Sequence, residues 1–448
     1  MNTILNLEHM ERSSLKELEE WKISPTRKPL LIYGARQVGK TWLMKQFGKS
    51  EFKNTVYVNF EKEIQLRSLF EQDYEPKRII KALETYFATD IKTGETLVIF
   101  DEIQEAKGAL TSLKYFKEEL SEQHVIGAGS LLGIAVKQQT SFPVGQVEFL
   151  NLYPMSFNEF LVATGNGKLA QVIKEKDWTL LTSLRTKIIS LLKSYYYVGG
   201  MPEAVLSFSQ NENYNQVRQI QESILQSYEQ DFAKHAPAEV IPRIRMLWNA
   251  VVSQLSKENK KFIYGLIRQG ARAKDFEIAL NWLEDYGLVY RVKRTKKANF
   301  PLAAYSDLSV FKLYVLDVGL LGALGNIHPQ ILIEKELLFN EFKGALTEQF
   351  VLQELKSGGQ KQLFYWANDS GSAEIDFIFE KENTIIPLEV KASENLQSKS
   401  LKTFATKYPE IHCYRTSLSD YRQESWMTNL PLYGVSGSWM KRLFLKKL

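Results

Sequence analysis

The stretch that decides the fold is Pro29–Phe47, which reads PLLIYGARQVGKTWLMKQF. Four apolar residues run into the pattern G-x-x-x-x-G-K-T, which begins at Gly34 and ends at Thr41, and a helical pattern follows. Glycines in such a loop let backbone N–H groups face a phosphate, and the helix N-terminus adds a partial positive charge. The sequence therefore predicts a phosphate-binding loop between a strand and a helix.

Two side chains of this loop carry the predicted chemistry. Lys40 is expected to reach the β- and γ-phosphates of a nucleoside triphosphate, and the Thr41 hydroxyl is expected to hold Mg²⁺. The alternative is a plain strand, turn and helix in which the Lys-Thr pair occurs by chance. The predicted nucleotide-binding loop contains Gly34, Ala35, Arg36, Gln37, Val38, Gly39, Lys40, Thr41 and Trp42.

A second motif, Leu97–Glu102, reads LVIFDE and ends in two carboxylates. A continuous apolar run is typical of a buried parallel strand. Asp101 is expected to bind Mg²⁺, directly or through water, and Glu102 to act as general base on the attacking water. The two motifs in this order predict that the chain binds ATP and hydrolyses it.

Strand and helix patterns alternate around the two motifs. Strands are expected at Thr55–Phe60, at His124–Ser130 and at Phe142–Phe149, and a helix is expected at Leu110–Leu120. This alternation predicts a parallel sheet with helices on both of its faces. Residues 1–28 show a helical spacing of apolar side chains and are expected to pack on this core.

Length and composition limit the remaining possibilities. A chain of 448 residues is expected to hold two to four domains. The net charge of +5 is mild, so local basic clusters must mark any anionic partner. The single cysteine, Cys413, permits no intramolecular disulfide and fits a reducing cytoplasm. Neither a signal peptide nor the ~20 apolar residues of a membrane span are present, so a cytoplasmic protein without a membrane segment is expected.

Five segments of this chain together resemble a family of prokaryotic AAA-type (AAA+) ATPases. These proteins carry a C-terminal domain, formerly of unknown function, with a restriction-endonuclease-like core of the PD-(D/E)xK type. The resemblance covers nearly the whole chain, and the two ATPase motifs are its most specific part. The matching segments are GARQVGKT at 34–41, FDEIQ at 100–104, GSLLG at 129–133, YPMSFNEF at 153–160 and YVGGMPEA at 197–204.

The resemblance implies further roles and partners. Ser130 stands where related ATPases place a polar residue that senses the γ-phosphate or water; a helix N-cap is the alternative role for this serine. The family also implies that copies of the chain form a homo-oligomer. Members often carry a basic residue that reaches a neighbour's γ-phosphate, but Gln146 stands at that position and cannot supply the charge. No arginine finger is therefore predicted.

The middle of the chain is expected to form a winged-helix-like module. Two helices are predicted at Arg243–Ser256 and Arg272–Tyr286, followed by a strand at Leu288–Val292. The basic run Lys293–Lys297 is expected at the tip of a hairpin that returns through Phe311–Leu316. DNA phosphates are the expected partners of this module, and a solvated hairpin that packs between domains is the alternative. The candidate DNA-binding residues are Arg272, Lys274, Lys293, Arg294, Lys296 and Lys297.

The C-terminal part shows a pattern that resembles the PD-(D/E)xK nucleases. A helix with Glu348 in its middle precedes a strand with Asp376 at its centre and a strand that ends in Glu389-Val390-Lys391. Asp376 and Glu389 are the expected ligands of Mg²⁺ or Mn²⁺, and Lys391 would orient the water or stabilise the transition state. Ile375 stands where the proline of the motif belongs. A catalytically silent binding platform is the alternative.

Together these patterns predict an α/β protein with a P-loop AAA-type core, a helical lid, a winged-helix-like module and a restriction-endonuclease-like domain. The expected boundaries are 1–28 for the N-terminal helical linker, 29–157 for the core, 158–240 for the lid, 241–325 for the winged-helix-like module and 326–448 for the nuclease-like domain. We expect an ATPase, with ATP and Mg²⁺ as cofactors, that acts on DNA by remodelling or metal-dependent cleavage. The alternatives are a DNA-binding ATPase with a silent platform and a nucleotide-dependent switch for a protein partner.

Overall fold

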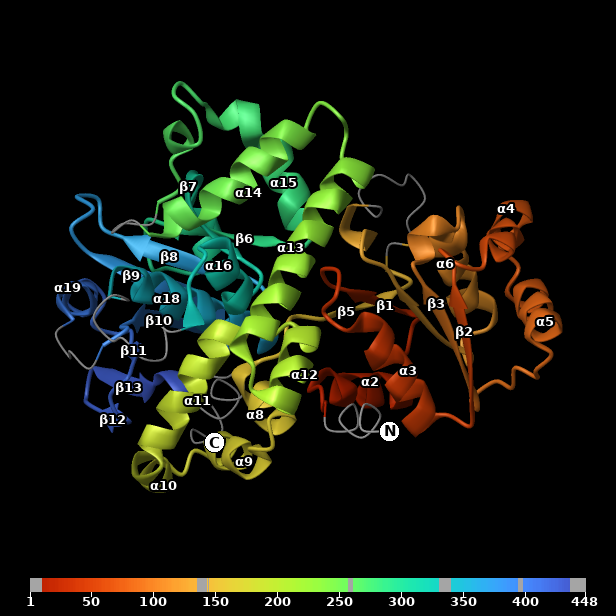
Figure 1. The fold of residues 1–448 in the computed structure, drawn as a ribbon, viewed down its shortest axis with the longest axis horizontal. Coiled ribbons are helices and arrows are strands. Elements are labelled where there is room, and N and C mark those ends of the chain that lie inside the picture. The colour runs from red at the N-terminus through yellow and green to blue at the C-terminus, as the bar shows by residue number, and fades with distance from the viewer. Residues whose placement is uncertain are drawn as a thin grey trace. The chain divides into compact units, whose positions relative to one another are not determined.

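The computed structural model separates the chain into two compact units, which are described one at a time (Figure 1). The N-terminal unit contains residues 11–153, with residues 285–287. The C-terminal unit contains residues 154–284 and the chain from residue 288 onward. The structure describes residues 10–134, 143, 145–256, 261–329, 340–393 and 398–435.

A five-stranded parallel sheet forms the middle of the N-terminal unit. Its strand order is β2-β3-β4-β1-β5, and every neighbouring pair is parallel. The parallel sheet predicted from the sequence is therefore confirmed. The predicted strand from Phe142 begins at Glu148 in the described chain, and Phe142 itself lies outside the described residues. The strands are β1 (Leu30–Tyr33), β2 (Asn54–Asn59), β3 (Thr96–Asp101), β4 (His124–Ala128) and β5 (Glu148–Asn151).

Helices cover both faces of this sheet. Side chains of α5 and α6 form a core with alternate residues of the strands, among them Val98 and Phe100. Successive strand residues point to opposite faces, so buried Ile99 faces the other side. Helix α3 packs against β2, β3 and β4, and its buried Phe47 is not part of the first core. The helices are α2 (Ser14–Ile23), α3 (Lys40–Glu51), α4 (Leu69–Gln72), α5 (Pro76–Phe87) and α6 (Ala109–Glu119).

The first part of the C-terminal unit is helical, as predicted for residues 158–240. Helix α8 (Phe157–Ala163) begins with a capping box, in which Ser156 and Glu159 satisfy each other's backbone N–H groups. Pro202 stands in the first turn of its helix, where the missing N–H costs no bond. The helices that follow are α9 (Gly167–Glu175), α10 (Trp178–Ser183), α11 (Arg185–Val198), α12 (Pro202–Asn211) and α13 (Tyr214–His235).

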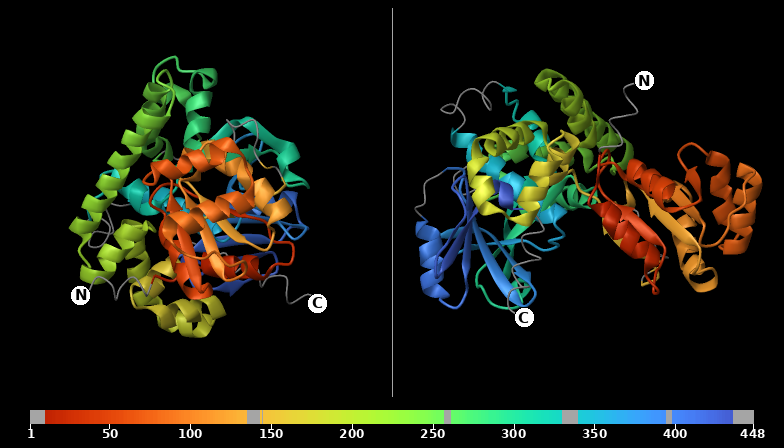
Figure 2. Two further views of the ribbon diagram at one scale, coloured as in Figure 1. Left: turned by 90° about the vertical axis from the view of Figure 1, so that its right-hand side faces the viewer. Right: turned by 90° about the horizontal axis from the view of Figure 1, so that it is seen from below.

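An eight-stranded mixed sheet forms the second part of this unit, with the order β12-β13-β11-β10-β9-β8-β6-β7. Helix α19 (Lys399–Lys407), in blue, packs on one face of this sheet (Figure 2). Its Phe404 contacts Trp366 of β8. The strands are β6 (Val289–Thr295), β7 (Ser306–Val315), β8 (Phe364–Ala367), β9 (Glu374–Lys381), β10 (Thr384–Val390), β11 (Cys413–Ser417), β12 (Arg422–Gln423) and β13 (Met427–Pro431). The other helices of the unit are α14 (Ile241–Leu255), α15 (Ala273–Asp285), α16 (Val318–Leu324) and α18 (Asn340–Ser357).

The β6–β7 hairpin differs from its prediction in one respect. The basic run Lys293–Lys297 is not the tip, because β6 continues to Thr295 and the returning strand begins at Ser306. Strand β8 pairs with β6 in parallel from Lys293 to Thr295 and supplies the hydrogen-bond partners that a free wing would lack. The hairpin therefore forms the edge of the eight-stranded sheet, whose other strands, from β8 onward, all follow the predicted boundary at residue 325.

Candidate functional site

The predicted phosphate-binding loop lies between β1 and α3, as the sequence indicated. Gly39, which precedes the first residue of α3, has φ +96°, a conformation that side chains disfavour. Gly34 has a different constraint, because a Cβ atom there would lie 2.4 Å from the carbonyl oxygen of Leu152. The first N–H groups of α3 have no partner within the helix and are available to an anion.

Lys40 is directed toward the backbone of its own loop. Its side chain is buried, and Nζ donates to the carbonyl oxygens of Gly34 at 2.7 Å and Ala35 at 2.9 Å. Burial lowers the pKa of Lys40 to about 8, against the opposing influence of Glu102 and Asp101. The two carbonyl oxygens are neutral, so they compensate only in part for taking the ammonium out of water.

The two sequence motifs meet at one hydrogen bond. Thr41 Oγ1 donates to Asp101 Oδ2 at 2.7 Å, and the carboxylate is almost fully buried, with 2% of Asp101 exposed. The Tyr57 hydroxyl donates to the same oxygen at 2.7 Å and fixes the carboxylate from β2. A hydroxyl oxygen and a carboxylate oxygen are the ligand types that Mg²⁺ takes, so the residues fit this ion.

Glu102 follows β3 in a left-handed turn, with φ +51°. Its Oε2 atom accepts hydrogen bonds from the Ser130 N–H at 3.1 Å, the Ser130 hydroxyl at 3.2 Å and Gln104 Nε2 at 2.7 Å. The structure therefore brings Ser130 beside the predicted general base, at the end of the neighbouring strand β4. This contact is compatible with both roles that the sequence left open for the serine.

The remaining predicted residues of the loop differ in exposure. Ala35 and Val38 are buried, whereas Arg36 and Gln37 are exposed at the loop surface. Trp42 is half-buried in the first turn of α3. Gln146 lies in another part of the N-terminal unit, in the turn before β5, where its N–H donates to Pro143 O.

Arg12 also contacts the phosphate-binding loop, and no sequence motif marks it. The residue is 5% exposed, and its guanidinium donates to Val38 O at 2.9 Å and to Tyr153 O at 2.6 Å. It therefore joins the phosphate-binding loop to the segment that follows β5. Sequence reasoning missed this residue because it stands just before α2, far along the chain from both motifs.

The predicted nuclease-like residues also come together, within the C-terminal unit. Antiparallel pairing of β9 with β10 places Asp376 beside Val390, whose N–H donates to Asp376 Oδ2 at 2.8 Å. Lys391 Nζ lies 2.9 Å from Glu389 Oε1. Among the described residues, no three or more His, Cys, Asp and Glu side chains are grouped so that they could hold a metal ion.

A residue that the sequence did not indicate lies in the middle of this carboxylate cluster. Lys312 of β7 is 1% exposed, and its Nζ lies 2.6 Å from Glu374 Oε1, 3.6 Å from Asp376 Oδ1 and 3.8 Å from Glu348 Oε2. Burial alone would lower the pKa of Lys312, but the surrounding anionic groups outweigh it and raise the pKa well above its ordinary value. The only sequence signal is a single charge within the otherwise apolar run of residues 310–316.

The six predicted DNA-binding residues, all in the C-terminal unit, differ in their exposure to solvent. Arg272, Lys274, Lys296 and Lys297 are exposed. Lys293 and Arg294 are half-buried, and Arg294 forms an ion pair with Asp307 at 2.7 Å. Hydrogen bonds from Ser309 and Arg294 lower the pKa of Asp307 to about 2, so this carboxylate neutralises Arg294 at neutral pH.

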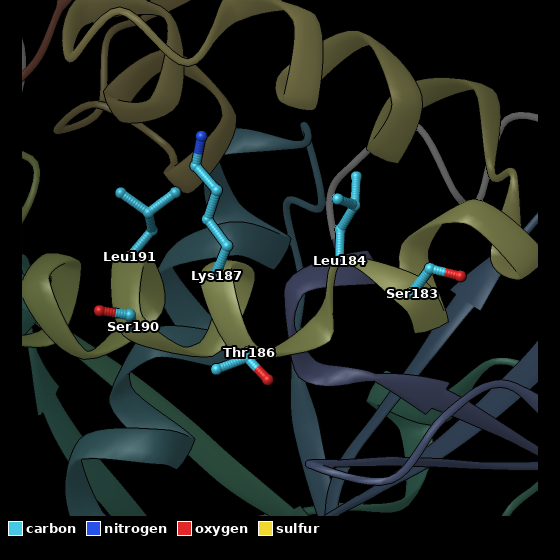
Figure 3. A pocket seen from close by; sticks show the side chains of 6 residues that line it. All are labelled: Ser183, Leu184, Thr186, Lys187, Ser190 and Leu191. Atoms are coloured by element: carbon cyan, nitrogen blue, oxygen red, sulfur yellow. The ribbon is translucent and has the colours of Figure 1, made fainter.

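A shallow pocket of about 520 Å³ lies along α11 (Figure 3). Figure 3 shows Leu184, Lys187 and Leu191 extending from the same side of the ribbon. None of the predicted site residues lines it. The lining residues are Ser183, Leu184, Thr186, Lys187, Ser190 and Leu191.

Comparison with known families divides the chain into three matched segments. The family model described as an AAA domain matches residues 26–161. Residues 189–331 match a domain of unknown function (DUF8612), and residues 343–433 match another (DUF4143). The AAA-type nature of the N-terminal segment, predicted from its motifs, is thereby confirmed. No curated protein matches the chain.

Solved structures resemble the chain only loosely. A Walker-type ATPase of Pyrococcus abyssi shares 14% identity, with a TM-score of 0.44, over 70% of this chain and 96% of that one. The Orc1 protein of Aeropyrum pernix, solved in complex with DNA, shares 11% identity with a TM-score of 0.28, over 70% of this chain and 92% of its own. Cdc6p of Pyrobaculum aerophilum shares 13% identity with a TM-score of 0.25, over 74% and 98% of the two chains.

Across the described ranges, none of the helices combines the length and the apolar character needed to cross a bilayer.

The contacts of Arg12 generate a prediction about the loop. Arg12→Ala removes the donor from the Val38 and Tyr153 carbonyls, and leaving such groups unpaired costs about 2–4 kcal/mol in total. We expect faster hydrogen exchange at the amides of residues 34–41 and a lower unfolding temperature of the N-terminal unit. Lys16→Ala, which removes an exposed cation from α2, is the matched control and should change neither quantity. Unchanged exchange in Arg12→Ala would contradict the assigned contact.

Proposed function

We propose that the N-terminal unit binds ATP with Mg²⁺ and hydrolyses it. One observation carries the proposal. The Thr41 hydroxyl and the Asp101 carboxylate, which stand 60 positions apart, share a 2.7 Å hydrogen bond beside the phosphate-binding loop. The AAA-domain match over residues 26–161 supports the same assignment.

The residues of the loop divide the work of binding. Backbone N–H groups between Gly34 and Thr41 face the phosphates, and the N-terminus of α3 adds partial positive charge. Lys40 exchanges its two neutral carbonyl partners for a phosphate oxygen, a stronger, charge-assisted interaction. Thr41 and Asp101 would hold Mg²⁺, and Tyr57 keeps the carboxylate in position. The ion, when bound, neutralises charge that develops on the phosphate oxygens.

Glu102 is proposed as the general base. It stands directly after Asp101, and three hydrogen bonds from Ser130 and Gln104 hold its Oε2 atom at the edge of the sheet. The carboxylate accepts a proton from the attacking water. The hydrogen bonds from Ser130 restrict the orientation of this carboxylate. Ser130 is proposed to keep contact with either the base or the water.

Substitutions at Lys40 and Glu102 separate binding from hydrolysis. Lys40→Ala is expected to abolish measurable ATP binding, because it removes the charge that meets the phosphates. Glu102→Gln is expected to bind ATP and to lose about 10²–10⁴-fold in turnover, as general-base loss predicts. Calorimetry measures the binding, and phosphate release measures the turnover.

Lys49→Ala on the exposed face of α3 is the matched control for these variants. It removes a lysine from the same helix without touching the loop, so it should keep wild-type binding and turnover. Wild-type affinity in Lys40→Ala would contradict the nucleotide site. Wild-type turnover in Glu102→Gln would contradict only the general-base role of Glu102 and would leave the nucleotide site standing.

The pKa of Lys40 makes ATP affinity depend on pH. With a pKa of about 8, the free lysine loses its charge as the pH rises through this value, whereas a bound phosphate favours the charged form. Binding therefore takes up a proton above the pKa, and affinity should fall by up to roughly tenfold per pH unit there. Calorimetry in buffers with different ionisation enthalpies detects the proton. The Lys49→Ala control should show the same pH dependence. A wild-type ATP affinity that stays constant as the pH rises above about 8 would contradict the role assigned to Lys40.

DNA is the proposed partner of the C-terminal unit. The exposed cations Arg272, Lys274, Lys296 and Lys297 support phosphate contacts. Asp307 neutralises Arg294 at 2.7 Å and lies 3.9 Å from Lys296 Nζ. Copies of the chain are proposed to form a homo-oligomer, as AAA-type domains do in the family that the sequence resembles. A nucleotide-dependent switch for a protein partner is the competing function, and it predicts an ATPase rate that is indifferent to DNA.

For the carboxylate cluster we propose a platform that does not cleave DNA. Glu348, Asp376, Glu389 and Lys391 match the nuclease pattern, which favours metal-dependent cleavage. Lys312 opposes it, because an ammonium already lies among the carboxylates that would receive a metal. Of the two interpretations that the sequence left open, the position of Lys312 supports the platform.

DNA binding and the absence of cleavage can be tested in the full chain. The double variant Lys296→Glu/Lys297→Glu should weaken binding to labelled duplex DNA, and it should reduce the salt dependence by about one unit per lost phosphate contact. Lys402→Glu on the exposed surface of α19 is the control and should bind as wild type. We expect intact supercoiled DNA in Mg²⁺ or Mn²⁺. Nicking by wild type that Asp376→Ala abolishes would overturn the platform.

A further inference from the structure

Lys312 is a buried lysine on the edge strand β7, and its ammonium group lies near carboxylates of β9 and α18. It stands on β7, whose partner β6 separates it from β8 and β9 in the strand order. Its long side chain lies with Nζ 5.1 Å from the centre of the Tyr365 ring on β8 and ends among carboxylates of β9 and α18. A charge at this depth is costly unless it is paired, and Lys312, unlike Lys40, is paired with carboxylates.

The partners of Lys312 come from two elements. Glu374 and Asp376 belong to β9, and Glu348 belongs to α18. Each carboxylate that surrounds the ammonium at longer range has another partner: the Tyr314 hydroxyl donates to Glu348 at 3.0 Å, and the Val390 N–H donates to Asp376 at 2.8 Å. The ammonium is therefore enclosed by oriented oxygen atoms, as a metal ion would be.

We propose that Lys312 is the resident cation of this cluster and occupies the place of a divalent metal ion. An ammonium and a divalent ion cannot share the same oxygen atoms, because like charges at such short distance repel strongly where water is excluded. The wild-type cluster accordingly binds no metal. Lys312 thereby fixes β7 to α18 and β9 by charge, and this role is absent from the nuclease pattern.

The cluster nevertheless contains a carboxylate oxygen that Lys312 does not occupy. Glu389 is 2% exposed and uses Oε1 for Lys391, while its Oε2 atom is buried and makes no hydrogen bond with the described residues. Without the Lys312 ammonium, the oxygen atoms of Glu348, Glu374 and Asp376 would lose the cation that they share. Oxygen ligands of that kind suit Mg²⁺ and Mn²⁺. Replacing Lys312 by a neutral residue should therefore open a site for a divalent ion.

The test is a Mn²⁺ titration of the full chain without nucleotide, by calorimetry. Lys312→Met keeps an unbranched apolar side chain, slightly shorter than lysine, and removes the charge. We expect it to bind about one Mn²⁺ more than wild type, and Lys312→Met/Asp376→Asn to lose that ion. Lys356→Met, on the same helix as Glu348, removes an ammonium that donates to the Lys361 carbonyl; it is the control and should bind as wild type.

A second measurement guards against misfolding of the charge variant. Mn²⁺ should raise the unfolding temperature of Lys312→Met, whereas it should affect wild type and Asp376→Asn equally. If Lys312→Met does not fold, the double variant Lys312→Met/Glu374→Gln removes one charge of each sign and takes its place. No Mn²⁺ gain in a folded variant overturns the proposal. A Mn²⁺ ion that wild type binds and Asp376→Asn loses overturns it as well.

This inference rests on the proposed platform, and the two fail in different ways. Nicking of DNA by wild type would refute the platform. A wild type that neither nicks DNA nor binds Mn²⁺ at Asp376, together with a Lys312→Met variant that also binds none, would refute only the role assigned to Lys312.

Discussion

The N-terminal unit depends on the 2.7 Å hydrogen bond between Thr41 and Asp101, which joins two motifs that are distant in sequence. Parallel pairing makes this contact possible. Strands β1 and β3 both flank β4 and run in the same direction, so the residues that follow them meet at one edge of the sheet. The buried apolar strands provide the rigid base, and the loop and the acidic pair are positioned by it. A shift of either strand by one residue would turn its side chain to the other face.

Two lysines show how differently the chain treats a buried ammonium. Lys40 has neutral carbonyl partners, and burial lowers its pKa to about 8. Lys312 has carboxylates around it, and they raise its pKa well above the ordinary value in spite of burial. The first charge is held weakly and gains from an arriving phosphate. The second is already satisfied, so an incoming cation would have to displace it. One lysine is suited to ligand binding and the other to holding strands in place.

The sequence predicted what local pattern and order determine. The phosphate-binding loop, the parallel sheet and the strand that ends in Asp101 follow from runs of neighbouring residues. Arg12, Tyr57 and Lys312 were missed, because each acts on a partner far along the chain and carries no pattern of its own. The basic run at Lys293–Lys297 was taken for a turn on its charge. It continues β6 instead, because β8 offers hydrogen-bond partners that only the folded sheet brings near.

The polar face of α18 explains why the carboxylate cluster belongs to the architecture of the C-terminal unit. Gln349 bonds both the N–H and the carbonyl of Val315, and Gln353 accepts from the Val318 N–H, so the helix holds the chain as it leaves β7 for α16. Glu348, the residue before Gln349, meets Lys312 and Tyr314 of the same strand. These contacts form one ladder between β7 and α18. While Glu348 holds the Lys312 ammonium, its carboxylate is not available to a metal ion. The ion pair at Lys312 is therefore better explained as one of the contacts that join β7 to α18 than as part of a catalytic centre.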